Sequence, residues 1–390
     1  MSICLKDLGV VCSIGQTKSA VFEALLSKSN DGLVLNSDLP IEKSQYVGQV
    51  SLPESDVFNG ISTRNNKLAY LAYQQIESTL TPLIAMYGHD RVAVIIGTST
   101  AGTYEAELAR KLFDETGEYP KYFHYEIQEM VAPAHYVASL CQATGPVYSI
   151  STACSSSGKA FVSGKALLDS GLVDVVVVGG VDSLTHLTVN GFESLASISQ
   201  DKCQPFNKNR DGINIGEAAT LFVLTKENTG IQMLGAGETS DAFHMSAPEP
   251  NGDGAFLAMQ MALDNAGLVG SQVDYVNLHG TGTIKNDDME AKAMHKACGN
   301  SVLCGSTKRM TGHTLGAAGA LEIGLCWLLL SKYNPQNFIP SNIPSHEIDE
   351  TLPALNFSSG INIDNLNICM SNSFAFGGNN FSMVLGKSNE

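Results

Sequence analysis

The chain has 390 residues, of which 44% are hydrophobic and 16% are charged, and its formal net charge is −16. A chain of this length and composition can bury a large core. Its negative charge argues against general binding to nucleic acid or to anionic membrane surfaces. An acidic protein partner is still possible, but this chain would need a local basic patch to bind it.

The nine cysteines are odd in number, and no two of them form a C-x-x-C pair. Several lie in apolar runs, such as Leu325-Cys326-Trp327, which is typical of reduced, buried thiols rather than of a disulfide framework. No charged segment followed by a long apolar core opens the chain, and no run of about 18 apolar residues appears, so we expect neither a signal peptide nor a membrane span. Together these features indicate a cytoplasmic protein.

Apolar, β-branched runs predict buried strands. In chain order these runs are 91–97, 147–151, 173–178, 220–224, 273–278, 367–370 and 381–385, with an interrupted first strand at 3–8. Apolar residues three or four positions apart predict helices at 156–169, 254–266, 287–297 and 317–330. Strands that are apolar on both faces and alternate with helices predict an α/β fold with helices on both sides of the sheet.

No linker rich in proline, serine or charge divides the chain. The segments that could carry chemistry nevertheless form two groups, one around residue 150 and one between 275 and 380. We therefore expect two halves that meet at one site.

Cys154 follows a predicted strand and precedes a Ser-rich segment that opens a predicted helix. At a helix N-terminus the helix dipole favours the nucleophilic thiolate, and free backbone N–H groups can hold a developing oxyanion. The same pattern also suits a small buried thiol at a tight turn. This segment alone leaves both interpretations open.

His279 ends a predicted strand and enters a Gly/Thr turn at 280–283. Glycines there allow a substrate to approach closely, and threonines offer hydroxyl groups. The alternative is a core histidine whose hydrogen bonds are satisfied internally.

His313 precedes a helix of small residues that must pack tightly, and Lys308 lies five residues earlier. Lys308 could pair with Glu322 and position the site, although composition alone favours a solvated surface lysine. Further along, a predicted strand ends, the aromatic pair Phe374 and Phe376 follows, and Gly377-Gly378 comes next. This last segment could be a mobile loop at a site or an ordinary glycine hairpin.

Four segments resemble one family in order, content and spacing: T-A-C-S-S-S, H-G-T-G-T, S-T-K-R-M-T-G-H and N-S-F-A-F-G-G-N-N. The segments 205–212 and 240–245 also match it. The family is that of the β-ketoacyl-acyl-carrier-protein synthases of the thiolase superfamily, and the resemblance covers nearly the whole chain.

The resemblance implies a thiolase-like α/β fold with two similar βαβαβ-type halves in five layers (α-β-α-β-α). Residues 1–225 would carry the nucleophilic cysteine, residues 226–390 would carry two histidines, and two helices would be shared in the middle. A thiolase would have a second cysteine in the C-terminal Gly-rich loop, but 374–380 has none. Starter-type synthases would have Cys-His-Asn. The set Cys154, His279 and His313 is that of the elongating type, which takes both substrates from acyl carrier protein.

The resemblance also implies a role for each residue in a decarboxylative Claisen condensation. Cys154 would take the acyl group, and His279 and His313 would donate hydrogen bonds to the enolate of the malonyl unit. Lys308, paired with Glu322, would tune the electrostatics. The backbone N–H groups of Cys154 and Phe376 would form an oxyanion hole.

Substrate contacts are implied as well. Thr281 and Thr283 would hydrogen-bond the phosphopantetheine arm, and Phe376 would gate the acyl pocket. Phe374, Phe192 and Thr100 complete the expected substrate-binding set. No metal or organic cofactor is implied, because the substrates arrive on the phosphopantetheine of acyl carrier protein.

The chain departs from the general pattern in places. Ile284-Lys285 stands where the family usually has proline after the Gly/Thr turn. The segments 286–291 and 327–330 look closer to ketosynthases of aryl-polyene clusters than to housekeeping fatty-acid enzymes. We expect either a homodimer or a heterodimer with a chain-length-factor-like paralogue. A non-catalytic chain-length factor, which would lack the cysteine, and a thiolase are the alternative functions.

Overall fold

The computed structural model describes residues 2–27, 32–36, 44–58, 60–61, 63–341 and 347–388. Within these ranges, eleven strands form one mixed sheet in the order β12-β10-β9-β14-β15-β8-β1-β7-β6-β4-β5. The strands of one side are β1 (Ile3–Cys12), β4 (Val92–Gly97), β5 (Val147–Ile150), β6 (Val175–Asp182) and β7 (Ala218–Thr225). Those of the other side are β8 (Ile231–Ser240), β9 (Tyr275–Asn277), β10 (Leu303–Gly305), β12 (Asn356–Phe357), β14 (Ile368–Phe374) and β15 (Asn379–Lys387).

Helices separate most of these strands. They are α1 (Lys18–Leu26), α2 (Arg64–Gln74), α3 (Glu77–Tyr87), α4 (Thr103–Thr116), α5 (Ala132–Cys141), α6 (Ser156–Asp169), α7 (His186–Ser194), α8 (Asp253–Ala266), α9 (Ile284–Cys298), α10 (Lys308–Thr311) and α11 (Ala318–Leu330). Two small ribbons, β2 (Val34–Asn36) with β3 (Gln45–Val47) and β11 (Phe338–Ile339) with β13 (Ile361–Asn362), lie outside the large sheet.

The predicted strands and helices are all present, with shifted ends. The structure extends the strand predicted at 173–178 through Gly179-Gly180 to Asp182. It also extends the first strand, predicted at 3–8, to Cys12. Strand β8 and helices α1 to α5 were not predicted. Mixed or short apolar patterns, such as I-Q-M-L-G-A-G in β8, give a weak signal.

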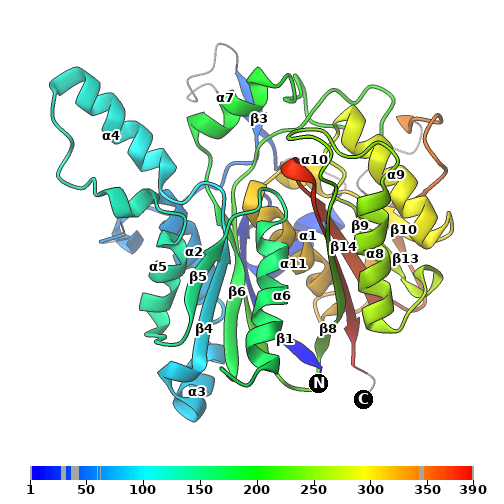
Figure 1. The fold of residues 1–390 in the computed structure, drawn as a ribbon, viewed down its shortest axis with the longest axis horizontal. Coiled ribbons are helices and arrows are strands. Elements are labelled where there is room, and N and C mark those ends of the chain that lie inside the picture. The colour runs from blue at the N-terminus through cyan, green and yellow to red at the C-terminus, as the bar shows by residue number, and fades with distance from the viewer. Residues whose placement is uncertain are drawn as a thin grey trace.

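The large sheet has two parts that are joined only weakly. Strands β1 and β8 pair through two residues at the start of each strand, Ile3 with Met233 and Cys4 with Gln232. Beyond this contact the parts diverge and enclose α6 and α11, which lie in the middle of the molecule (Figure 1). Helices α2 and α5 cover one outer face, and α8 and α9 cover the other. The fold is therefore the predicted thiolase-like arrangement of five layers, and the predicted division at 225/226 falls between β7 and β8.

Alternation along the strands explains why both faces of each sheet are covered. In β4, Val92, Val94 and Ile96 pack toward α2 and α5. Ala93 and Ile95 from the same strand pack into the central core with α6 and α11. Successive side chains of a strand point to opposite faces, so a strand that is apolar at every position needs a helix on each side.

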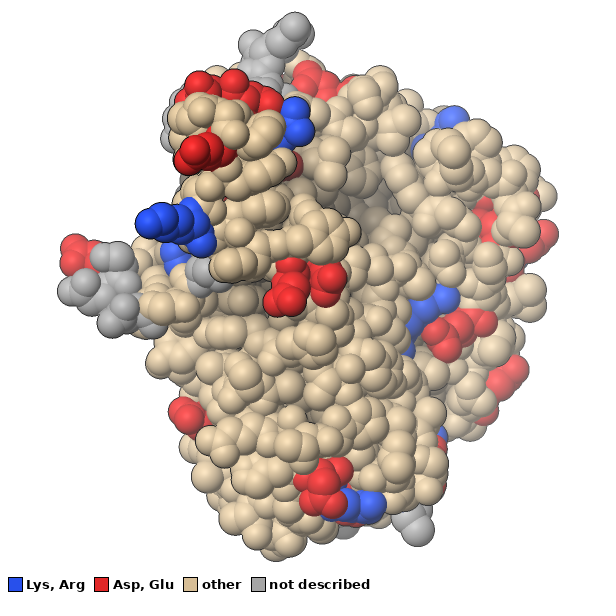
Figure 2. All heavy atoms as spheres, turned by 60° about the vertical axis from the view of Figure 1, so that its left-hand side comes forward, with Lys and Arg blue, Asp and Glu red and all other residues tan. Residues whose placement is uncertain are grey.

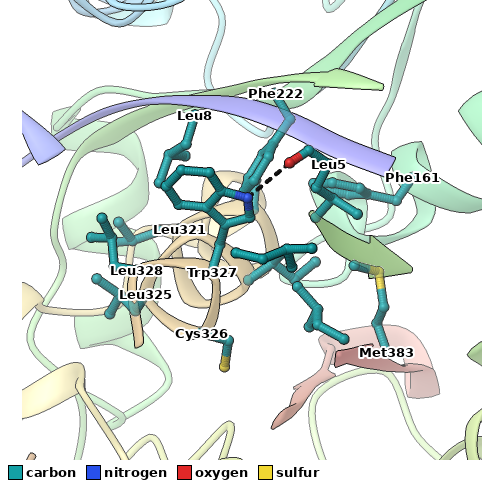
Figure 3. Close-up of a cluster of buried hydrophobic side chains, with 14 of the residues drawn as sticks. Leu5, Leu8, Phe161, Phe222, Leu321, Leu325, Cys326, Trp327, Leu328 and Met383 are labelled. Carbon is teal, nitrogen blue, oxygen red and sulfur yellow. Dashed lines mark hydrogen bonds between the residues drawn. The ribbon is translucent and has the colours of Figure 1, made fainter. Parts of the chain in front are cut away.

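Helix α11 is the centre of this core, since all 13 of its residues are buried. Its Trp327 lies among Leu8, Phe222 and Leu328, and the indole N–H donates to the backbone carbonyl of Leu5 at 2.8 Å (Figure 3). The hydrogen bond satisfies the single polar group of a large buried ring.

The two central helices approach closely at a pair of glycines. A Cβ atom added at Gly319 of α11 would lie 2.8 Å from the backbone nitrogen of Gly158 in α6. Real Cβ atoms do not come so near, so the contact requires glycine. This contact brings the N-terminal ends of α6 and α11 together, and Cys154 and His313 lie just before those ends.

Within the part of the chain that the structure describes, no helix is long and apolar enough to cross a membrane. All nine cysteines are free and buried, as their apolar settings predicted.

Candidate active site

A cavity of about 260 Å³ opens between the two parts of the molecule. Its lining includes predicted site residues from both: Cys154 and Phe192 from the first part, and His279, His313, Thr281, Thr283, Phe374 and Phe376 from the second. The structure therefore brings together residues that lie up to 222 positions apart, from 154 to 376.

Cys154 lies in the turn between β5 and α6, two residues before the first helical residue. The residue before it, Ala153, has a φ of 52°. A left-handed conformation is uncommon for a residue with a Cβ, and such strain persists only where the surroundings hold it in place. The turn directs the sulfur into the cavity.

The thiol of Cys154 is not the low-pKa thiolate that the sequence predicted. Burial raises its pKa to about 11, although Lys308 and the backbone N–H groups of Phe376 and Cys154 act in the opposite direction. The sequence argument included the helix dipole but not desolvation, which here has the larger effect. The resting thiol is therefore protonated, and its location on the cavity, rather than its pKa, distinguishes it from the other eight.

The same contacts place two donors at the sulfur. The backbone N–H groups of Phe376 and Cys154 lie close enough to the sulfur to lower the pKa of the thiol. These are the two groups predicted to form the oxyanion hole, and they are adjacent to the atom that would attack a thioester carbon.

Both histidines reach the thiol region. Nε2 of His313 is 2.9 Å from Cys154 Sγ. The His279 and His313 rings are 5.3 Å apart between centroids and nearly perpendicular, at 85°. Burial lowers the pKa of each ring well below its usual range, and Lys308 lowers both further. Both imidazoles are therefore neutral near pH 7.

Lys308 is buried, at 1% exposure, so the surface interpretation of this lysine is wrong. Its ammonium forms an ion pair with Glu322, which is 2% exposed. The same ammonium lies 3.4 Å from Nδ1 of His279. An ammonium only donates, so Nδ1 accepts and the ring proton is on Nε2. Lys308 thus fixes the tautomer in which His279 can donate from its other nitrogen.

Two buried carboxyl groups that sequence reasoning missed hold the loops of the site. Glu290 accepts hydrogen bonds from the backbone N–H groups of His279 and Gly280 at 2.7 and 2.6 Å. Asp182 accepts from the backbone N–H of Ala317 at 3.0 Å, and its other oxygen accepts from the segment 98–100. Burial raises the pKa of Glu290 to about 8 and also raises that of Asp182. For Asp182 the available sequence signal was a lone carboxylate at the end of the apolar strand β6.

The residues predicted to contact substrate lie in two groups, a pair of threonines and a set of phenylalanines. The hydroxyls of Thr281 and Thr283 lie 3.1 Å apart on the cavity wall. The Phe376 ring packs against Phe192 with centroids 5.3 Å apart, and the Phe374 ring lies 6.1 Å from His279. Phe376 and Gly377 are held to the loop 241–248 by the hydrogen bond from Gly377 N–H to the Met245 carbonyl, at 2.8 Å.

Thr100 differs from its prediction, because it does not line this cavity. Its hydroxyl donates to Asp182 at 2.7 Å and accepts from the backbone N–H of Ser183 at 3.1 Å. The side chain is thus occupied in the hydrogen-bond network that links β4 to β6 within this chain.

A metal ion is a poor fit to the Cys154, His279 and His313 cluster. The sulfur and one nitrogen of each ring lie within 4.8 Å of one another, a spacing that ligands can show. The buried ammonium of Lys308 lies against His279, however, and a second cation there would be repelled at close range in a medium of low dielectric constant.

Known proteins share both the sequence and the fold. The model of the β-ketoacyl synthase N-terminal domain matches residues 72–229, and that of the C-terminal domain matches residues 231–342. The 3-oxoacyl-[acyl-carrier-protein] synthase 2 of Staphylococcus aureus (strain COL) is 31% identical over 76% of this chain and 75% of its own. The protein of the same name from Synechocystis is 28% identical over 99% of this chain and 98% of its own.

Solved structures agree. A ketosynthase (ApeO), in complex with its chain length factor (ApeC), from Xenorhabdus doucetiae has a TM-score of 0.92 and 42% identity, and the match covers 99% of this chain and 98% of that one. The ishigamide ketosynthase/chain length factor has a TM-score of 0.88 and 25% identity, and the match covers 100% of this chain and 99% of that one.

The chain therefore belongs to the β-ketoacyl synthase family. It is a ketosynthase, an acyltransferase-type condensing enzyme. Enzymes of this family use no cofactor beyond the phosphopantetheine that carries the substrate. The thiolase alternative lacks support, since the loop 374–380 has no cysteine. The non-catalytic alternative conflicts with the presence of Cys154 beside both histidines.

Proposed function

We propose that this ketosynthase extends an acyl chain on Cys154 with a malonyl unit delivered by acyl carrier protein. The contact between Cys154 and His313, with His279 beside them, carries the proposal. One reacting carbon must reach the sulfur and both rings, and these groups are close enough for that.

In the first half-reaction the Cys154 sulfur attacks the thioester carbon of the incoming acyl group. The oxygen of the tetrahedral intermediate takes the negative charge and is held by the backbone N–H groups of Cys154 and Phe376. Collapse of the intermediate releases the phosphopantetheine thiol, which carries away the proton of the cysteine. The acyl group remains on Cys154.

In the second half-reaction malonyl-carrier protein enters. Loss of CO2 leaves an electron pair on the thioester enolate, whose oxygen accepts hydrogen bonds from His279 and His313. Neutral imidazoles provide these donors, and the Lys308 ammonium adds a positive charge behind His279. The enolate carbon then attacks the acyl-Cys154 carbonyl, and the cysteine sulfur leaves. Removing one such donor typically slows a reaction by about 100- to 1000-fold.

A paired assay of two variants tests this assignment. His313→Ala should keep part of its acylation of Cys154 but lose decarboxylation by about 100-fold or more. Cys154→Gln should form no acyl-enzyme but should still release CO2, because the glutamine side chain fills the space of an acylated cysteine. Intact mass measures acylation, and CO2 release from malonyl-carrier protein measures decarboxylation.

His295→Ala and Cys12→Ser are the matched controls, since His295 is exposed on α9 and Cys12 is buried away from the cavity lining. Both should retain both half-reactions. A His313→Ala enzyme that decarboxylates at the wild-type rate would show that His313 does not have this role.

We further propose that a chain-length-factor-like paralogue is the partner subunit, as in the ApeO and ishigamide complexes. Residues 130–158, which include α5, the edge strand β5 and the Cys154 turn, contain no Lys, Arg, Asp or Glu. Figure 2 shows a broad face with few charged side chains on the side of α5 and β5. An edge strand in an uncharged face suits a permanent protein contact.

Native mass spectrometry tests the partner proposal, with the chain expressed alone and together with the candidate paralogue. Ser139→Glu adds a charge at an exposed position of α5 and should weaken the complex, whereas Met261→Glu, exposed on α8, should not. A chain that forms the same homodimer with and without the paralogue would contradict the heterodimer. The nine free thiols support a cytoplasmic location, and elongation in an aryl-polyene or other polyketide pathway remains a prediction.

A further inference from the structure

One wall of the cavity runs outward along a continuous stretch of chain, from His279 to Lys285. Exposure rises along it: His279 is 1% exposed, Thr281 6% and Ile284 59%. Thr283 is half-buried and Lys285 is exposed. All five residues line the cavity. Because consecutive Cα atoms lie 3.8 Å apart at most, these six steps can span up to about 20 Å. The wall therefore leads from His279 to the surface, which is a path that a linear substrate can occupy.

The outer end of this wall differs from the rest of the cavity in charge. The charged residues of the lining are Asp211, Asp241 and Lys285. Asp211 accepts from Ser199 at 2.6 Å, and Asp241 accepts from Asn380 at 2.6 Å, so both carboxylates already accept hydrogen bonds within the protein. No ion pair of Lys285 is found within the described residues. The Lys285 ammonium at the cavity mouth attracts an anionic ligand at that point, although the net charge of the chain is −16.

Ile284 adds an apolar contact just inside this charge. Ile284 lines the cavity and is 59% exposed, so a ligand that covers it gains binding free energy from burying apolar surface. The order along the wall is thus donor histidine, two hydroxyls, an apolar side chain and a cation.

We infer that Ile284 and Lys285 are specificity residues for the outer part of the substrate arm: Ile284 packs on its carbon chain, and Lys285 binds its phosphodiester. This rests on the proposed function, because the arm is that of a phosphopantetheine thioester whose acyl end lies at His279. Lys285 thereby favours substrates that carry the phosphate over the same thioester without it.

The experiment measures CO2 release by Cys154→Gln enzyme from three probes: malonyl-pantetheine, malonyl-phosphopantetheine and malonyl-carrier protein. In this background Lys285→Ala should raise KM about tenfold for both probes that carry the phosphate, leave kcat unchanged and leave malonyl-pantetheine unaffected. Ile284→Ser should raise KM several-fold for all three. Added salt should weaken binding of the phosphate-bearing probes in the parent enzyme and have less effect in Lys285→Ala.

Lys332→Ala is the matched control. Lys332 follows the C-terminal end of α11, and His313 lies before the other end of this helix. The 13 residues of α11 span about 20 Å, so Lys332 is far from the cavity. It should change no KM. An equal KM change for malonyl-pantetheine in Lys285→Ala would overturn the phosphate contact, as would a change seen only with the carrier protein, which would indicate contact with the carrier surface instead. A parent enzyme that decarboxylates none of the three probes would instead refute the proposed function.

Discussion

The two parts of the molecule hold their site residues by different means. The first part presents Cys154 from a short turn between β5 and α6, where the neighbouring residue Ala153 has a positive φ. The second part presents His279 from a loop that buried ionisable groups hold in place: Lys308 contacts the ring, and Glu290 binds the backbone at His279. One half therefore relies on local backbone geometry, and the other relies on contacts between distant residues.

This difference indicates where each half is vulnerable. A turn set by backbone conformation depends on a few adjacent residues and on the helix packing beneath it. A loop held by buried charges depends on each charge keeping its partner, because an unpaired buried charge is costly. Substitutions in the second part should therefore have the larger effects, and the following expectations test that order.

The largest effect is expected for Lys308→Met. This change leaves the Glu322 carboxyl buried without its cation and removes the partner of His279 Nδ1. Breaking a buried pair on one side typically costs about 3–5 kcal/mol. The free energy of unfolding from urea titration should fall accordingly, and decarboxylation should fall with it.

A rescue variant and a surface pair sharpen this expectation. Lys308→Met with Glu322→Gln should recover part of the lost stability, since no charge is left buried, but should not recover decarboxylation. Lys6→Met breaks a pair whose side chains are 33% and 35% exposed, and should cost at most about 1 kcal/mol. Equal losses for Lys308→Met and Lys6→Met would refute the contrast.

The next largest effect is expected for Gly319→Ala, which tests the helix contact beneath the Cys154 turn. The new Cβ would lie 2.8 Å from the Gly158 nitrogen, so α6 and α11 must move apart. Overpacking of this kind costs about 1–3 kcal/mol. Gly191→Ala in α7 is the control, because its Cβ would meet nothing within 4 Å and should add up to about 1 kcal/mol of stability. Similar thermal midpoints for the two variants would contradict the close contact.

Much of the fold was predictable from the sequence because buried strands such as β4 and β6 are apolar at almost every position. Helices α6 and α11 were predictable for similar reasons. The short strand β10 and the helices α4 and α5 were not, because three-residue strands and faces with mixed polarity resemble loops in sequence. The local patterns left the roles of Cys154 and His279 open, and the resemblance to the family singled out Cys154, His279 and His313 together.

The parts of the site that could not be predicted depend on burial and on distant partners. Composition favoured a solvated surface for Lys308, and only the resemblance implied its pairing with Glu322; the 1% exposure of Lys308 depends on contacts that the local sequence does not show. The raised pKa of Cys154 has the same origin, because desolvation depends on residues from both halves. Glu290 lies on a different element from the backbone N–H groups that it binds, and Asp182 is far in sequence from the Ala317 N–H. Their roles therefore become visible only in the folded structure.

The third expectation concerns the protonation of His279. Burial, more than Lys308 or His313, lowers the pKa of this ring well below its usual range. Lys308→Met should raise that pKa, but burial should still keep it below the value of about 6.5 found in unfolded chains. In the wild type the unfolded chain binds protons at His279 and His313 near pH 6.5, whereas the folded chain does not. The free energy of unfolding should therefore fall as the pH falls below about 6.5. Histidine-selective NMR titration measures the change, and a ring that titrates at its ordinary pKa in the wild type would contradict it.

The smallest effect is expected for Ala153→Gly, which tests the local geometry of the Cys154 turn. Glycine adopts a φ of 52° without a Cβ penalty, so stability should change little or rise by up to about 1 kcal/mol. Gln142, at a φ of 54° in the exposed C-cap of α5, gives the matched control, and Gln142→Gly should show the same stability change. Only Ala153→Gly should slow acylation of Cys154, by a few-fold, because the more flexible turn holds the sulfur less firmly; decarboxylation, whose donors belong to the other half, should stay unchanged. Stopped-flow acylation and CO2 release separate the two steps, and a loss confined to decarboxylation would mean that the turn positions the histidines rather than the cysteine.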